Sequence, residues 1–189
     1  MRIGFVGGGT GGHFYPLVAT AEFLTQHSAK PELYYFGPSP YSKELLQEHN
    51  IKFVYVPAGK LRRYFSLQNI LDIGKAILGI PIAIVKLYLI YPDVIFSKGG
   101  YTSIPILSAA WFLRIPVVIH ESDVIPGRAN KFAKRFAKYI AISWEDTAEY
   151  FAKEKGKVAL TGIPIRESIK KIHEKAATKK GNPEEKPLL

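Results

Sequence analysis

Hydrophobic positions in this chain fall into short runs that alternate with longer stretches of helical spacing. The runs hold three or four mainly β-branched or aromatic residues, and glycine, proline or charged residues bound them. Continuous apolar runs of this length are typical of parallel strands buried on both faces of a sheet. They predict strands at Ile3–Val6, Leu33–Phe36, Phe53–Val56, Val94–Phe96, Val117–Ile119, Tyr139–Ile142 and Val158–Leu160.

The stretches between these runs place apolar residues three or four positions apart, as amphipathic helices do. They predict helices at Pro16–His27, Ser42–His49, Ser66–Leu89, Ser103–Leu113, Asn130–Ala137 and Glu145–Lys153. Regular alternation of strand and helix predicts an α/β fold with a Rossmann-like, doubly wound parallel sheet. The texture changes at residues 167–189, which are charged and have no strand pattern until the chain ends on Pro187-Leu188-Leu189.

The composition of the chain excludes several kinds of functional site. The chain has 189 residues, a formal net charge of +10 and no cysteine. A basic excess favours an anionic partner, and the absence of cysteine excludes disulfides, thiolate metal sites and a cysteine nucleophile. No residues have the spacing of metal ligands, so we expect no metal site.

The middle of the chain combines apolar and basic residues. The most apolar stretch, Ala76–Tyr91, is too short to span a bilayer and is interrupted by Pro81 and Lys86, so we expect it to be buried or interfacial. Its apolar positions are too many for one buried stripe. Apolar surface surrounded by cations favours a peripheral contact with an anionic membrane, and no nucleic-acid-reading element is visible. The residues predicted to make this contact are Arg62, Arg63, Ile73, Lys75, Ile77 and Ile80.

A glycine-rich segment, GFVGGGTGGHF, follows the first predicted strand. Gly7, Gly9 and Gly12 fit the dinucleotide fingerprint, but no acidic residue ends the second strand to bind a ribose. The spacing also fits a P-loop, but His13 and Phe14 stand where that motif needs lysine and serine or threonine. What remains is a turn that presents backbone N–H groups and a helix N-terminus to an anion, with His13 at its rim.

A second glycine loop, SKGGYTSIP, follows the fourth predicted strand, and the fifth strand ends in His120, Glu121 and Asp123. In open α/β sheets, ligands bind outside the carboxyl ends of the strands. We therefore expect both glycine loops and these side chains to flank one crevice.

The titratable residues at this edge have different expected roles. The dipole of the following helix is expected to lower the pKa of His13 and to favour its neutral, basic form. His120 has an equally simple role as a hydrogen-bonding residue within the sheet. Glu121 is either a catalytic carboxylate or a cap for the segment that follows it.

Four segments together resemble the MurG family: GGTGGHFYP (Gly8–Pro16), KGGYTSIP (Lys98–Pro105), HESDVIPGRANK (His120–Lys131) and TGIPIR (Thr161–Arg166). This family comprises the bacterial GlcNAc transferases that convert lipid I to lipid II in peptidoglycan synthesis. Its members have the GT-B fold, in which two Rossmann-like domains face a cleft. The resemblance implies an N-terminal acceptor- and membrane-binding domain at residues 1–166. Residues 167–189 would be a linker helix and the start of a C-terminal nucleotide-binding domain.

The resemblance also implies roles for individual residues. His13 is the first candidate for the general base of an inverting, metal-independent transfer, and Glu121 is the second. Donor contacts to UDP-GlcNAc are implied for Thr10, Gly11, Gly12, Asp123 and Arg166. Contacts to the acceptor, undecaprenyl-pyrophosphoryl-MurNAc-pentapeptide, are implied for Gly8, Gly9, Gly99, Gly100, Tyr101, His120 and Asn130. No cofactor is expected, and the implied location is the cytoplasmic face of the bacterial membrane, bound peripherally.

Three alternatives stay open on the sequence. The chain is also compatible with a non-catalytic, membrane-docking subunit that binds acceptor for a separate nucleotide-binding partner. A dinucleotide-dependent oxidoreductase is a weaker alternative. Related GT-B enzymes use similar glycine loops to glycosylate other lipids, so the acceptor itself has alternatives.

Overall fold

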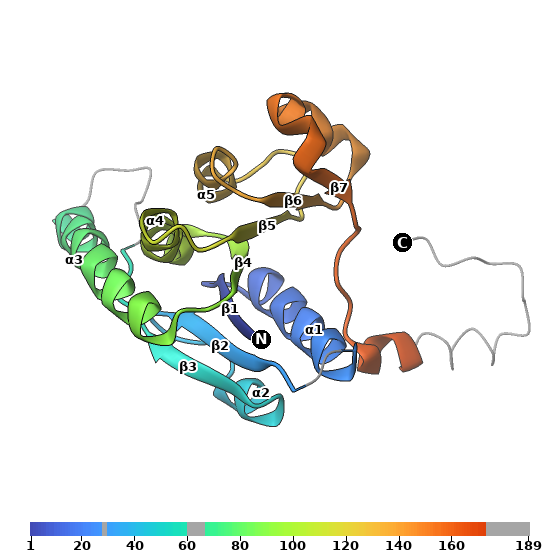
Figure 1. The fold of residues 1–189 in the computed structure, drawn as a ribbon, viewed down its shortest axis with the longest axis horizontal. Coiled ribbons are helices and arrows are strands. Elements are labelled where there is room, and N and C mark those ends of the chain that lie inside the picture. Colours follow the sequence, from blue (N-terminus) through green and yellow to red (C-terminus); the bar gives the residue numbers. More distant parts are fainter. Residues whose placement is uncertain (28–29, 60–66, 173–189) are drawn as a thin grey trace, which may run out of the picture.

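A computed structural model describes residues 1–27, 30–59 and 67–172, and a parallel sheet forms the centre of this part of the chain (Figure 1). Its seven strands lie in the order β3-β2-β1-β4-β5-β6-β7, and every neighbouring pair is parallel. The strands are β1 (Arg2–Gly7), β2 (Glu32–Gly37), β3 (Ile51–Tyr55), β4 (Val94–Gly99), β5 (Val117–Glu121), β6 (Tyr139–Ile142) and β7 (Val158–Leu160).

All the predicted strands are present, and two of them continue beyond their apolar runs through buried polar residues. β4 continues through Ser97 and Lys98 to Gly99, which pairs with Gly7 of β1. β5 continues through His120 to Glu121, which pairs with Ile142 of β6. The hydrophobic pattern missed these ends because their side chains are polar, although they are buried. The polar residues of the predicted crevice therefore belong to the sheet itself.

Helices alternate with the strands as predicted, with different bounds. They are α1 (Gly11–His27), α2 (Lys43–Glu48), α3 (Leu67–Ile90), η1 (Tyr101–Ser103), α4 (Ile104–Phe112), α5 (Arg128–Ala133) and η2 (Glu145–Lys157). α1 begins at Gly11, before the predicted Pro16, because the Thr10 carbonyl accepts the N–H groups of His13 and Phe14. The predicted α-helix after β6 is instead a kinked 3₁₀ helix, with non-helical backbone angles at Phe151 and Glu154.

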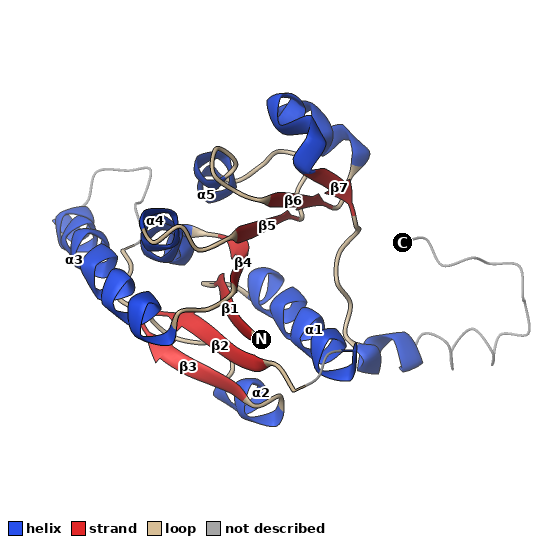
Figure 2. Ribbon diagram, in the orientation of Figure 1, coloured by secondary structure: helices blue, strands red, loops and turns tan. Residues whose placement is uncertain are grey.

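The helices cover both faces of the sheet (Figure 2). Phe14, Leu17 and Val18 of α1 pack with Leu46 of α2 against one face. The core on the other face includes Ala83 and Leu87 of α3, and Ile106, Leu107, Ala109 and Ala110 of α4. This arrangement confirms the doubly wound fold. Since β1 lies between β2 and β4, the winding reverses beside β1, and the carboxyl ends of β1 and β4 form the edge where such sheets bind ligands.

After β7 the chain returns to α1 (Figure 1). Arg166 Nε donates to Glu22 Oε1 over 2.9 Å, and the Glu167 backbone N–H donates to Glu22 Oε2. Residues 167–172 then form a short helical segment. The end of the domain expected at Arg166 is thus held against the first helix. No helix in the described ranges is long and apolar enough to cross a membrane.

Candidate functional site

The two glycine loops lie against each other at the carboxyl ends of β1 and β4. A Cβ on Gly9 would lie 3.0 Å from Tyr101 Cε1, and one on Gly100 would lie 3.1 Å from the Gly8 carbonyl oxygen. Gly99 and Gly100 have φ angles of +81° and +83°, which favour glycine over residues with a side chain. The predicted convergence of the loops on one crevice is confirmed.

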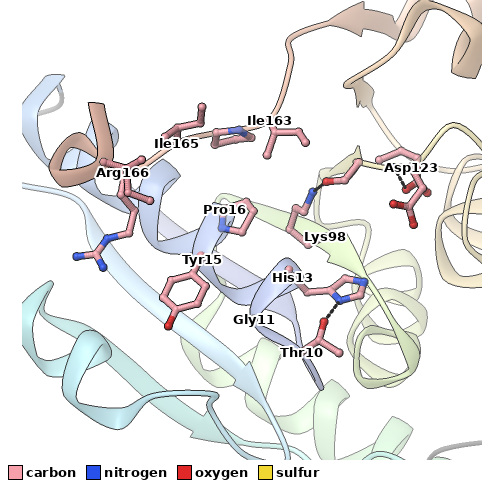
Figure 3. A pocket seen from close by; sticks show the side chains of 15 residues that line it. Thr10, Gly11, His13, Tyr15, Pro16, Lys98, Asp123, Ile163, Ile165 and Arg166 are labelled. Carbon is pink, nitrogen blue, oxygen red and sulfur yellow. Dashed lines mark hydrogen bonds between the residues drawn. The ribbon is translucent and has the colours of Figure 1, made fainter. Parts of the chain in front are cut away.

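Beside these loops is a cavity of about 540 Å³ (Figure 3). The first turn of α1, the end of β4, the loop after β5 and the returning segment at residues 163–169 form its wall. The expected site residues that line it are Thr10, Gly11, Gly12, His13, Glu121, Asp123 and Arg166. Segments separated by more than 150 positions in the sequence therefore meet around one space.

The remaining expected site residues are not part of the cavity wall. They are Gly8, Gly9, Gly99, Gly100, Tyr101, His120 and Asn130. Asn130 is buried against Gly99 and donates through Nδ2 to the His120 carbonyl and to Glu121 Oε2. These residues shape and support the loops behind the cavity.

His13 is half-buried in the first turn of α1. Its Nδ1 lies 2.8 Å from Thr10 Oγ1, and a Cβ on Gly100 would lie 3.7 Å from its Nε2. Burial lowers the pKa of His13, the positive charge of Lys98 lowers it further, and Asp123 and Glu121 oppose this shift. The expected direction of the shift is confirmed, and its largest cause is burial.

The Glu121 carboxylate binds the segment that follows it. Oε1 accepts the backbone N–H of Asp123 over 3.0 Å, and Oε2 accepts the N–H of Gly127 and the Asn130 amide over 2.9 Å each. The alternative that Glu121 caps its neighbouring segment matches this geometry. A proton on this carboxylate would remove its charge and weaken the bonds that hold the loop in place.

His120 joins strand β4 to the returning segment. Its Nδ1 accepts a hydrogen bond from Lys98 Nζ over 2.7 Å, and its Nε2–H donates to the Gly162 carbonyl over 2.8 Å. Burial, followed by the nearby charge of Lys98, lowers the pKa of His120 to about 4, so the ring is neutral at physiological pH. The bond to Lys98 of β4 is a hydrogen bond within the sheet, as the expected alternative had it, and the bond to Gly162 reaches a second segment outside the sheet.

Among the Lys, Arg, His, Asp and Glu side chains that line the cavity in the described ranges, Lys98 is the one to which the sequence reasoning assigned no role. It is buried, and burial lowers its pKa to about 8. Its place directly before the glycines, at a predicted strand end, was the available signal.

Arg166, the cation expected to meet the donor, is paired within the protein. Besides its bond to Glu22, the same Oε1 atom lies 3.3 Å from His49 Nε2. In Figure 3, Arg166 lies at one end of the cavity and Lys98, His13 and Asp123 lie at the other.

The residues expected at a membrane surface lie partly outside the described residues. Arg62 and Arg63 are among the residues not described, as is the side chain of Ile73. Ile77 is exposed, Ile80 is half-buried, and Lys75 Nζ lies 3.6 Å from Asp72 Oδ1.

The outer side of α3 is apolar beyond the predicted residues. Gly79, Ala83 and Leu87 are buried on one side of the helix, and the large side chains on the other side are exposed. At the end of α4, Trp111 and Phe112 are 61% and 67% exposed. We define the α3–α4 surface as Ile77, Leu78, Ile82, Val85, Tyr88, Leu89, Trp111 and Phe112. The sequence reasoning missed the two aromatic residues, because the α4 pattern alone did not show which side chains remain uncovered.

In the described ranges, no group of three His, Asp or Glu side chains is arranged to hold a metal ion.

Comparison with known proteins places most of the chain in one family of domains. Residues 3–142 match the glycosyltransferase family 28 N-terminal domain. The chain is 40% identical over 190 residues to UDP-N-acetylglucosamine--N-acetylmuramyl-(pentapeptide) pyrophosphoryl-undecaprenol N-acetylglucosamine transferase 3 of Bacillus thuringiensis (strain Al Hakam), covering 100% of this chain and 53% of that protein. It is 42% identical over 165 residues to the transferase of the same name, without a number, from Legionella pneumophila (strain Lens), covering 87% and 45%. The chain spans about half the length of these curated relatives.

Solved structures have a similar fold. Acinetobacter baumannii MurG matches with a TM-score of 0.64 and 24% identity, covering 88% of this chain and 46% of that one. A UDP-GlcNAc 2-epimerase from Neisseria meningitidis, bound to UDP-GlcNAc, matches with a TM-score of 0.64 and 19% identity, covering 95% and 53%. These likenesses confirm the expected fold, a Rossmann-like domain of the kind that forms the N-terminal half of a GT-B glycosyltransferase.

Proposed function

This chain belongs to the glycosyltransferase family 28 N-terminal domains, and we propose that it is the acceptor-binding half of a hexosyltransferase. The proposed reaction transfers GlcNAc from UDP-GlcNAc to the C4 hydroxyl of MurNAc in lipid I, with inversion, and yields lipid II for peptidoglycan. The observation that carries the proposal is the cavity at the carboxyl ends of β1 and β4, where His13 faces the glycine loops. The full-chain identity to transferases named for these substrates supports the choice of substrate.

His13 is the proposed general base. Its lowered pKa keeps the imidazole neutral at physiological pH, which is the form that accepts a proton. Thr10 supports this role because its hydroxyl can select the tautomer of His13. When Nδ1–H donates to Thr10 Oγ1, Nε2 has no proton and is free to accept one. The acceptor hydroxyl would then lie between Nε2 and the anomeric carbon of the donor.

The bond changes follow from inversion. The C4 oxygen of the acceptor forms a bond to the anomeric carbon on the face opposite the diphosphate. The bond from that carbon to the diphosphate oxygen breaks, and its electron pair leaves with UDP. The proton of the attacking hydroxyl passes to His13 Nε2. Neutralisation of the departing diphosphate by backbone N–H groups and cations requires no metal ion at this step.

In this proposal, the other expected residues either contact the donor or support the loops that contact it. Thr10, Gly11, Gly12 and Asp123 line the cavity and are the proposed contacts of this half to the donor sugar nucleotide. Most of the donor site belongs, in this proposal, to a nucleotide-binding domain of the same protein or of a partner chain. Glu121 and Asn130 hold the loop that presents Asp123, through the hydrogen bonds of the Glu121 carboxylate.

We further propose that the α3–α4 surface binds the cytoplasmic face of the membrane peripherally. Its exposed aliphatic and aromatic side chains would enter the interface, and Lys75, Lys86 and Arg114, which are exposed on the same helices or just after them, would meet anionic lipid. A lipid-linked acceptor resides in such a membrane, so this contact would bring the cavity to its substrate.

The direct test is transfer of labelled GlcNAc by the full-length protein that contains this chain. UDP-GlcNAc is supplied with a lipid I analogue in one reaction and with diacylglycerol in another. Transfer to the lipid I analogue alone is expected. Transfer to diacylglycerol alone would replace the proposed acceptor, and no transfer to either lipid would contradict the proposed activity.

A further inference from the structure

Lys98 enters the cavity as a buried ammonium group. Its residue is only 3% exposed, yet it lines the same space as His13 and Asp123. The strands are arranged to admit it. A Cβ on Gly7, the last residue of β1, would lie 2.8 Å from Lys98 Cβ, so any larger residue at that position would displace the lysine. The end of β1 therefore leaves room for this side chain.

The positive charge of Lys98 has no compensating ion pair. Its Nζ donates to His120 Nδ1 and to Ser122 Oγ, and both acceptors are neutral. No carboxylate in the described part of the chain lies within salt-bridge distance of Nζ, and the nearby Glu121 oxygens already accept other N–H groups. An ammonium group has three N–H bonds. One of them has no acceptor among the described residues.

The second cation of the cavity wall differs in this respect. Arg166 is paired with Glu22 at 2.9 Å and lies at the far end of the cavity. A buried charge without a partner is costly, and proteins retain such groups mainly at functional sites. Of the lysines and arginines that line the cavity in the described ranges, Lys98 alone is without an ion pair, and Glu121 and Asp123 act on its charge only from beyond salt-bridge distance.

The surroundings of Lys98 indicate the chemistry of that ligand. The cavity includes the first turn of α1, whose free N–H groups bind anions. Several hydrogen-bond donors around the cavity match a ligand with several charged oxygens better than they match a single carboxylate.

We propose that Lys98 binds the diphosphate of a substrate, donating its third N–H to a phosphate oxygen while the first turn of α1 contacts the others. This inference rests on the proposed function, in which both substrates contain a diphosphate. The shared chemistry defines the subsite, and the donor and the lipid acceptor are the two sources to be distinguished.

Titration offers a test that needs no substitution. The titratable groups around Lys98 are His13 on α1, His120 and Glu121 on β5, and Asp123 in the loop that follows. Since the pKa of each histidine is lowered, both rings are neutral above pH 7. The pKa of Lys98 is about 8, so Lys98 loses its proton as the pH rises through that value. Affinity for a diphosphate should therefore fall between pH 7 and about pH 9.5.

The experiment measures binding of geranyl diphosphate and of UDP to this chain by calorimetry. Lys98→Met keeps the length of the side chain and removes its charge, and Lys153→Met removes an exposed lysine on η2 as the matched control. We expect Lys98→Met to weaken binding of at least one ligand by about tenfold or more, and Lys153→Met to leave both unchanged. Circular dichroism confirms that each variant is folded.

The outcomes distinguish the donor from the lipid acceptor as the source of the diphosphate, and the Lys98 subsite from the proposed function. A loss confined to geranyl diphosphate assigns the subsite to the lipid acceptor, and a loss confined to UDP assigns it to the donor. Equal affinities of folded Lys98→Met and the unsubstituted chain, or no binding of either ligand, overturn the inference. If Lys98→Met does not fold, affinity that is unchanged from pH 7 to about pH 9.5 overturns it. Full-length Lys98→Met that transfers GlcNAc normally would leave the proposed function standing without this subsite. A full-length protein that transfers no GlcNAc but still binds diphosphate through Lys98 would support the subsite and contradict the proposed function.

Discussion

The cavity at the carboxyl edge of the sheet and the α3–α4 surface are built in opposite ways. At the cavity, buried polar groups are held by hydrogen bonds, and those of Lys98 and His120 join segments 22 and 42 positions apart in the sequence. On the α3–α4 surface, large apolar side chains such as Leu89, which is 71% exposed, extend from two helices into solvent. Hydrogen bonds fix direction, whereas apolar burial is proportional to area and has no preferred direction.

This difference indicates what each region recognises. Fixed polar groups in a concave site suit one ligand in one orientation. An exposed apolar surface with cations beside it suits a fluid, anionic partner. The comparison predicts that single substitutions in the cavity change turnover sharply, and that substitutions on the α3–α4 surface change membrane binding gradually.

The largest expected effect is that of His13→Ala on the full-length enzyme. Loss of a general base should lower kcat by about 10²–10⁴-fold, while thermal stability changes little because His13 is only half-buried. His27→Ala, at the exposed end of the same helix, is the matched control. A loss of less than about tenfold in steady-state assays would contradict the role of His13.

The next effect concerns the α3–α4 surface. Val85→Ser combined with Leu89→Ser removes two apolar side chains that are 56% and 71% exposed. If both enter the interface, binding to anionic vesicles should weaken by about tenfold to a hundredfold in sedimentation assays. Kinetics with a soluble acceptor analogue should stay normal. Leu160→Ser, on the far edge of the sheet, should change nothing, and equal binding by all three proteins would disprove the membrane contact.

A smaller effect is expected for Thr10→Val, which removes the hydroxyl bound to His13 Nδ1. Without that partner the tautomer with a free Nε2 is less favoured, and kcat should fall by about tenfold. Thr10→Ser restores the hydroxyl and should restore kcat. If valine and serine at this position give equal rates, the hydrogen bond does not control the tautomer.

The smallest expected effect is a displacement of the pH profile. Burial and Lys98 lower the pKa of His13, so the base should stay neutral to a lower pH than a free histidine does. The acid limb of kcat/KM should therefore have its midpoint below about 6.5, with activity lost as the pH falls through it. Lys98→Met removes one lowering cause and should move this midpoint upward. A midpoint above about 7 in the unsubstituted enzyme would be inconsistent with the geometry of His13.

Much of the fold followed from the pattern of apolar residues. Short apolar runs alternating with helical spacing are enough to specify a parallel sheet, because parallel strands need crossover helices that cover both faces. The same topology explains why the two glycine loops and the end of β5 were expected at one edge. What the pattern missed was local: β4 and β5 continue through buried polar residues, and α1 begins in the glycine loop because the Thr10 carbonyl accepts its first N–H groups.

The sequence by itself determined that both glycine loops and the end of β5 lie at the carboxyl edge of the sheet, which residue types these loops contain and where His13 stands, since these depend on local pattern and topology. Only the tertiary structure decided how the charges are used. Arg166 is paired with Glu22, 144 positions away, and so has less charge available to a ligand than its motif suggested. Lys98 bonds to the neutral His120, 22 positions away, and has no ion pair among the described residues. The physical reason is that electrostatic pairing depends on distance and burial in space, and neither can be read from spacing along the chain.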